Sequence, residues 1–159
     1  MRFLLVDTIR ELEPGRRIRA SKRVPADLEL FRDHFPGFPV VPGVLLTEMM
    51  AQAAGKCLDA EGARPGRAML GGIQNATFRG WVRPEEEVMI YAEIVQNQPA
   101  YATAKCFLEV DGRKVSSAEL FFVFAPYEQF GGRHRDEVLA SYLESNPMTG
   151  EAASNDDRE

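Results

Sequence analysis

The sequence predicts an α+β fold in which an antiparallel sheet curls around one central helix. The segment 44–58 contains no helix-breaking residue before Gly55 and is apolar on nearly every side, which is typical of a helix buried all round. Strand-like segments follow this helix at 68–78, 87–96, 101–110 and 114–124. A single apolar helix beside so many strands is best buried by a sheet that wraps it.

The composition is that of one globular domain, with 159 residues, 45% of them apolar and 27% charged. No apolar stretch approaches the roughly 18 residues of a membrane span. The N-terminus also lacks the long apolar region of a secretory signal, so we expect a cytoplasmic protein that does not bind membranes. Two cysteines, Cys57 and Cys106, and two histidines show no zinc-ligand spacing, and we expect neither a metal nor a cofactor.

The start of the chain predicts a hairpin, with strands at 3–9 and 17–24 joined by a turn at Glu13-Pro14-Gly15. The following residues, 25–42, contain four prolines and predict a stiff loop without regular structure. Near the other end of the domain, Asp111-Gly112 is a strong hairpin signal between the last two strands.

The chain divides by charge into a neutral body and an acidic end. We predict one domain over residues 1–127 and a C-terminal extension over 128–159, made of a short exposed helix at 135–143 and an acidic, disordered tail. The whole formal net charge of -5 lies in the extension. A body without excess positive charge argues against a nucleic-acid-binding protein.

Two ionisable residues suggest acid–base chemistry. His34 lies in the proline-rich loop, where its ring would be held in one place, as a general base requires. Glu48 is the one carboxylate in the apolar helix, and burying it is costly unless it is paired or protonated. Because burial raises the pKa of a carboxyl group, Glu48 is a candidate proton donor.

Two further residues fit the same site. Gln52 follows Glu48 by four residues, so both lie on one helical face and the amide can orient the carboxyl group. Gly43 begins the helix, where the backbone N–H has no helical partner and lies at the positive end of the dipole. Such an N–H can stabilise an oxyanion.

These residues stand within a longer motif, and over residues 3–125 the chain resembles the beta-hydroxyacyl-acyl carrier protein dehydratases, hotdog-fold enzymes of fatty acid synthesis. The shared motif comprises His34-Phe35-Pro36-Gly37, Pro39-Val40, Pro42-Gly43-Val44-Leu45, Glu48 and Met50-Ala51-Gln52. The resemblance implies that the fold is a hotdog fold, with the sheet wrapped around one long helix.

The resemblance also implies a role for each site residue. His34 removes the C2 proton of a (3R)-3-hydroxyacyl thioester, and Glu48 protonates the departing hydroxyl to give a trans-2-enoyl thioester and water. The N–H of Gly43 polarises the thioester carbonyl. The carbonyl of Val40 fixes the imidazole tautomer, and Gln52 steadies Glu48.

The same resemblance implies partners. The substrate would be carried by acyl carrier protein, an acidic protein. The histidine of one subunit would face the glutamate of the other across a dimer, which assembles further into a hexamer in some members. Basic clusters at 16–23 and at Arg64, Arg67, Arg79 and Arg83 are candidate docking surfaces for the carrier.

Two other functions stay open at the level of sequence. A hotdog acyl-thioesterase would use a carboxylate to activate water and would not need His34. A non-catalytic acyl-binding or assembly subunit would have a closed tunnel, or a Glu48 engaged in structural pairing. The complete proline-rich setting of His34 favours the dehydratase.

Overall fold

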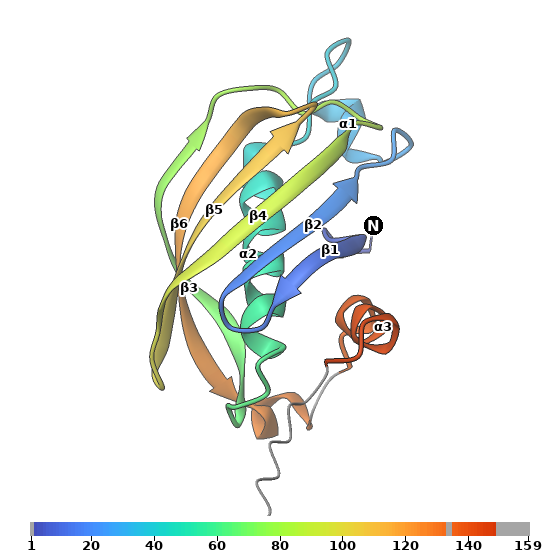
Figure 1. Cartoon of the computed structure of the whole chain (residues 1–159). Coiled ribbons are helices and arrows are strands. Elements are labelled where there is room, and N and C mark those ends of the chain that lie inside the picture. Colours follow the sequence, from blue (N-terminus) through green and yellow to red (C-terminus); the bar gives the residue numbers. More distant parts are fainter. Residues whose placement is uncertain (1, 133–134, 149–159) are drawn as a thin grey trace, which may run out of the picture.

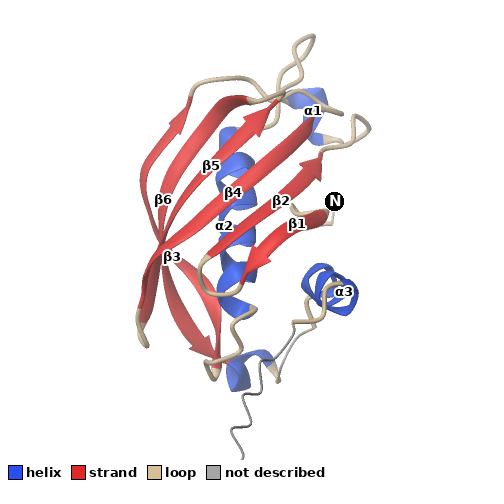
Figure 2. Ribbon diagram, viewed as in Figure 1, coloured by secondary structure: helices blue, strands red, loops and turns tan. Residues whose placement is uncertain are grey.

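In the computed structural model, which describes residues 2–132 and 135–148, the described strands form one six-stranded antiparallel sheet that curves around helix α2 (Figures 1 and 2). The strands are β1 (Thr8–Glu13), β2 (Arg17–Arg23), β3 (Gly66–Phe78), β4 (Glu87–Asn97), β5 (Tyr101–Val110) and β6 (Arg113–Pro126). The helices are α1 (Leu30–Asp33), α2 (Gly43–Asp59), the 3-10 helix η1 (Tyr127–Phe130) and α3 (Glu137–Ser145). The predicted α+β fold is confirmed.

The order of strands in the sheet is β1-β2-β4-β5-β6-β3, with every neighbouring pair antiparallel. Strand β3 follows α2 in the chain but pairs only with β6, so it forms one edge of the sheet. The hairpin predicted at Asp111-Gly112 is confirmed, and both residues have positive φ, 50° and 75°. Positive φ at both central residues is what a type I′ hairpin turn needs.

The core lies between α2 and the inner face of the sheet. Alternate residues of β5 point inward and are buried, from Ala102 to Val110. On the helix, Met49 and Met50 have no exposed surface and pack within the same cluster. Burial of large apolar side chains of this kind contributes roughly 1.5–3 kcal/mol each to stability.

The first strand was placed wrongly by the sequence pattern. Strand β1 begins at Thr8, and the apolar residues before it are not in a strand. Instead, this segment passes along α2, where Leu5 and Val6 are buried and the Leu5 N–H donates a 2.8 Å hydrogen bond to Gln52 Oε1. The loop predicted at 25–42 also contains one short helix, α1.

Helix α2 is not buried all round within one chain. Val44 is 76% exposed, and Glu48, Gln52 and Gly55 are only half-buried. Residues spaced by three or four positions share one face of a helix, so these four form a single open face. We call this stripe the open face of α2. The helix continues through Gly55 to Asp59 because glycine weakens a helix without ending it.

The C-terminal extension packs against the core. Helix α3 begins two residues later than predicted, and its Leu139 is buried. Asp136 caps this helix by accepting a 3.0 Å hydrogen bond from the Leu139 N–H, and its other carboxylate oxygen pairs with Lys56 Nζ. The domain boundary after residue 127 stays a prediction, and the acidic tail called disordered falls largely on residues 149–159, outside the described residues. No helix in the described ranges is long and apolar enough to span a membrane.

Both cysteines are core residues, and we expect them to be unreactive in the folded protein. Burial raises the pKa of Cys57 to about 11 and that of Cys106 to about 12. Because the thiolate is the reactive species, alkylation of the native protein at pH 8 should be very slow, whereas the unfolded chain should react at both thiols. Mass spectrometry of alkylated native and denatured samples checks this, and rapid native labelling of either thiol would contradict it.

Candidate active site

His34 is held in a tight loop directly after α1. Its Nδ1 lies 3.0 Å from the carbonyl oxygen of Val40, and the Val40 N–H in turn donates to the His34 carbonyl at 3.2 Å. Since a carbonyl can only accept, Nδ1 carries the proton of the neutral ring and Nε2 is left as the acceptor. Phe35 stacks on the ring with 4.2 Å between centroids. The imidazole therefore has a fixed orientation and a free basic nitrogen.

Glu48 is oriented by Gln52 one helical turn away. Gln52 Nε2 donates to Glu48 Oε1 at 3.1 Å and to the Phe3 carbonyl at 3.2 Å, while its Oε1 accepts from the Leu5 N–H. Because the Leu5 N–H can only donate, the amide nitrogen of Gln52 must face Glu48. This contact occupies one carboxyl oxygen and leaves the other available to carry a proton.

Gly43 begins α2 and presents an unused donor. Leu45 and Leu46 donate to the Pro42 carbonyl, but among the described residues no acceptor binds the Gly43 N–H. The ring of Phe78 lies against this residue, 3.1 Å from where a Cβ atom would stand. Glycine at this position therefore allows the Phe78 ring to pack closely beside an N–H at the positive end of the helix dipole.

The structure places His34 outside the lining of the groove that Glu48 faces. Glu48 and Gln52 line a groove of about 720 Å³ beside the open face of α2, and His34 is not among its lining residues. No hydrogen bond joins the two side chains within the described part of the chain. A base and an acid that act on neighbouring carbon atoms must face one substrate, and this groove of the single chain holds only the acid of the pair.

The edge strand β3, which supplies Met69 and Leu70 to this groove, carries several exposed apolar side chains. The edge strand β3 exposes Met69, Leu70, Ile73 and Phe78 by 38–52%. A long apolar strand with a free edge is a template for pairing with another chain. Val44, on the open face of α2, belongs to the same exposed apolar set.

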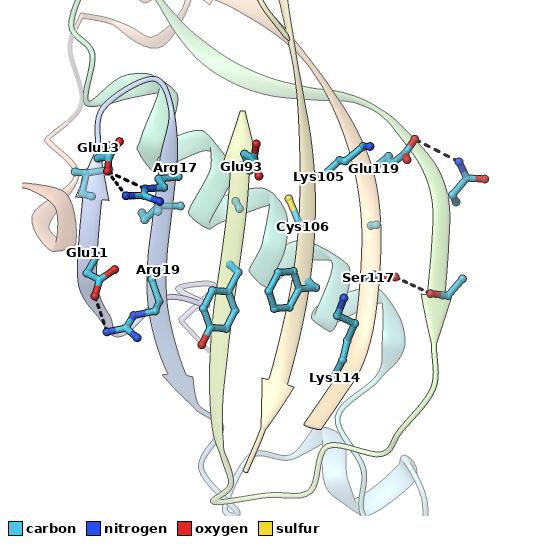
Figure 3. Close-up of a pocket in the computed structure, with 18 of the residues that line it drawn as sticks. Glu11, Glu13, Arg17, Arg19, Glu93, Lys105, Cys106, Lys114, Ser117 and Glu119 are labelled. Carbon is cyan, nitrogen blue, oxygen red and sulfur yellow. Dashed lines mark hydrogen bonds and ion pairs between the residues drawn. The ribbon is translucent and has the colours of Figure 1, made fainter. Parts of the chain in front are cut away.

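A second cavity, of about 1030 Å³, lies on the outer face of the sheet (Figure 3). Its charges are matched from strand to strand, because Arg17 stands opposite Glu93, Glu93 opposite Lys105, and Lys105 opposite Glu119. Arg17 also pairs with Glu13. Alternating charges at directly opposite positions stabilise a sheet, so most of the charges on this face already have a partner within the chain.

The fold and the two oriented side chains define a hotdog-type protein with acid–base groups at the central helix. Residues 1–119 match the family model of the FabA-like domain. A 3-hydroxyacyl-acyl-carrier-protein dehydratase FabZ from Levilactobacillus brevis is 41% identical over 124 residues, 77% of this chain and 84% of the relative. The FabZ of Listeria innocua is 37% identical over 128 residues, 80% and 89% of the two chains. The chain therefore belongs to the FabA-like family, on its FabZ dehydratase branch.

Solved structures agree on the fold. The dehydratase heterocomplex ApeI:P from Xenorhabdus doucetiae contains a chain that superposes with a TM-score of 0.65 at 14% identity, covering 80% of this chain and 87% of that one. This likeness supports the hotdog architecture at a level of sequence identity that shows the fold alone.

The structure adds residues that the sequence did not indicate. Phe3 and Leu5 hold Gln52 through their backbones, and Phe130 with Asp136 lines the groove beside Glu48. Backbone contacts leave no trace in side-chain type, so Phe3 and Leu5 carried no signal. Asp136 lies inside the helix predicted at 135–143 and directly before the observed α3, and its residue type is typical of an N-cap, which was a detectable signal for the later start.

Proposed function

We propose that His34 of one subunit and Glu48 of a second subunit dehydrate (3R)-3-hydroxyacyl thioesters to trans-2-enoyl thioesters. The observation that carries this proposal is the pair of oriented groups: His34 fixed by the Val40 carbonyl, and Glu48 fixed by Gln52. Membership of the FabA-like family supports the same reaction.

The reaction needs one proton removed and one supplied. His34 Nε2 takes the proton from C2, and the electron pair left there forms the C2–C3 double bond. Glu48 gives a proton to the hydroxyl at C3, so the C3–O bond breaks and water leaves. Negative charge that develops on the thioester oxygen is stabilised by the free Gly43 N–H. The protons on His34 and Glu48 then re-equilibrate through solvent.

The open face of α2 and the edge of β3 support a symmetric dimer. Two copies of β3 pairing edge to edge would extend the sheet across both subunits and cover Ile73 and its apolar neighbours. The same approach would bring the His34 loop of one subunit toward the groove that holds Glu48 of the other. Further assembly into a hexamer stays an expectation from the family resemblance.

The carrier-protein surface that we propose lies beside the His34 loop. Many basic residues of the clusters at 16–23 and 64–67 are paired with carboxylates, as Arg19 is with Glu11 at 2.8 Å. In contrast, Arg79 and Arg83 are exposed and have no carboxylate partner among the described residues. Arg83 stands 5.5 Å from the centre of the ring of Phe38, which follows His34 by four residues in the same loop. We further propose that the protein and its carrier act in the cytoplasm.

The purified protein should dehydrate 3-hydroxybutyryl thioester and hydrate crotonyl thioester. Absorbance in the enoyl-thioester band follows both directions, on acyl carrier protein and on coenzyme A. If the acidic carrier docks at Arg79 and Arg83, the rate with acyl carrier protein should fall as salt rises, while that with coenzyme A should change less. Absence of turnover from a folded protein would remove this function and favour an acyl-binding subunit.

The alternative function, a thioesterase, predicts a different product from the same substrates. A thioesterase would release free thiol, which a thiol-reactive dye detects, and would not create an enoyl product. The fixed orientation of His34 favours dehydration because a carboxylate-activated water would not need a second, oriented base.

A further inference from the structure

We propose that Phe130 of η1 and residues 135–137 at the start of α3 close the far end of the Glu48 groove and thereby set the longest acyl chain that the enzyme accepts. This inference rests on the proposed function, because it assigns the groove to the acyl chain of that substrate. The family match ends at residue 119, so this wall lies outside the matched region.

The groove begins at the catalytic carboxyl group and follows the open face of α2. It passes from Glu48 and Gln52 over Gly55 to Asp59, a path of about 16 Å at the rise of an α-helix. The apolar residues that line it include Leu4, Ala51, Met69, Leu70 and Phe122. An apolar channel that leads away from the reacting carbons is the environment that an acyl chain needs.

Gly55 keeps this channel open. A Cβ atom at this position would meet no heavy atom within 4 Å. Because residues 48, 52 and 55 share one helical face, the missing side chain leaves space in line with Glu48. A larger residue at 55 would project into the path of the acyl chain and would not disturb the core.

The far end of the groove is lined by charged residues, and an ion pair joins it to α2. Arg135, Asp136 and Glu137 line it, together with Lys56 and Arg67. Lys56 is 7% exposed and pairs with Asp136, which also caps α3, so the start of the extension is tied to α2 itself. Burial alone would raise the pKa of Asp136, but its hydrogen bonds from Lys56 and the Leu139 N–H lower it.

A charged wall stops an acyl chain for a simple reason. Pushing methylene groups against these side chains would remove water from charges without replacing its hydrogen bonds, which is costly. Phe130 of η1 lines the same groove and is 42% exposed, so its ring takes up space that an acyl chain would otherwise occupy. Chains that end before Phe130 should bind freely, and longer chains should be excluded by it.

Two substitutions in the full-length protein should move the chain-length limit in opposite directions. F130A should raise the ratio of kcat/KM for long-chain over short-chain 3-hydroxyacyl thioesters by roughly tenfold, because it opens the end of the groove. G55L should lower the same ratio by a similar factor, because it obstructs the middle. F107A is the matched control, since Phe107 lies on the outer face of the sheet against Tyr91. The long-chain over short-chain ratio of kcat/KM in F107A should equal that of the wild type.

Calorimetric binding of saturated acyl-coenzyme A of increasing chain length, on the same variants, tests the groove without any chemistry. Opposite shifts in the preferred length for F130A and G55L would support the proposal even if turnover were absent. Wild-type turnover combined with unchanged length profiles in both variants would overturn this inference and leave the dehydratase function intact. Equal shifts in F107A and F130A would also overturn it, because the effect would not come from the groove.

Discussion

Replacement of Glu48 by glutamine is expected to lower kcat for dehydration by roughly 10²- to 10⁴-fold, the usual contribution of a general acid. The substitution keeps the shape of the side chain, and its amide oxygen can still accept the hydrogen bond that Gln52 Nε2 gives to Glu48 Oε1. What it removes is the acidic proton. A loss of kcat without a change in thermal unfolding would therefore report the chemistry of the carboxyl group, and full activity in the variant would exclude Glu48 as the acid.

H34A should be equally inactive, and the two variants together test where the site lies. If each site takes His34 from one subunit and Glu48 from the other, a mixed dimer of H34A and E48Q subunits keeps one intact site and one that lacks both groups. Random mixing makes half of the dimers mixed, so roughly a quarter of the wild-type activity should return. Each variant alone is the control. No recovery after verified subunit exchange would place both groups in one chain.

Much of the site follows from short-range rules in the sequence. Prolines around His34 fix a loop, and the loop gives the imidazole its Val40 partner at 3.0 Å. The spacing of Glu48 and Gln52 puts them on one helical face, where they form the hydrogen bond of 3.1 Å. The position of Gly43 at the helix start indicated its role, and the family resemblance supplied that of Val40; the geometry of both residues is compatible with these roles. These are interactions within a few residues, which a sequence pattern can encode directly.

The remaining features depend on distant parts of the chain. The apolar segment before Thr8 looks like a strand, but it passes beside α2, where its backbone bonds Gln52. Likewise, apolar residues all around α2 cannot distinguish a face buried in the core from one reserved for another chain, and only the exposure of Val44 separates them. The Lys56–Asp136 pair spans 80 positions, beyond any local pattern.

The largest structural effect is expected from I73K on the edge strand β3. Ile73 is 52% exposed in the single chain, so a lysine there should change the stability of an isolated subunit by no more than about 0.5 kcal/mol. In a dimer paired through β3, the same lysine would be buried against apolar side chains of the partner near the two-fold axis. We expect the dimer to dissociate and turnover to fall by roughly two orders of magnitude or more, because His34 and Glu48 would separate.

V95K is the matched control, because Val95 on β4 is also 52% exposed but lies away from the β3 edge. It should remain dimeric and active. Sedimentation velocity gives the oligomeric state, and the enoyl-thioester assay gives turnover on the same samples. A dimeric, fully active I73K protein would place the interface elsewhere, whereas a folded, inactive monomer would link the exposed apolar strand directly to catalysis. The exposed apolar surface of β3 would then exist to complete an active site that neither subunit contains alone.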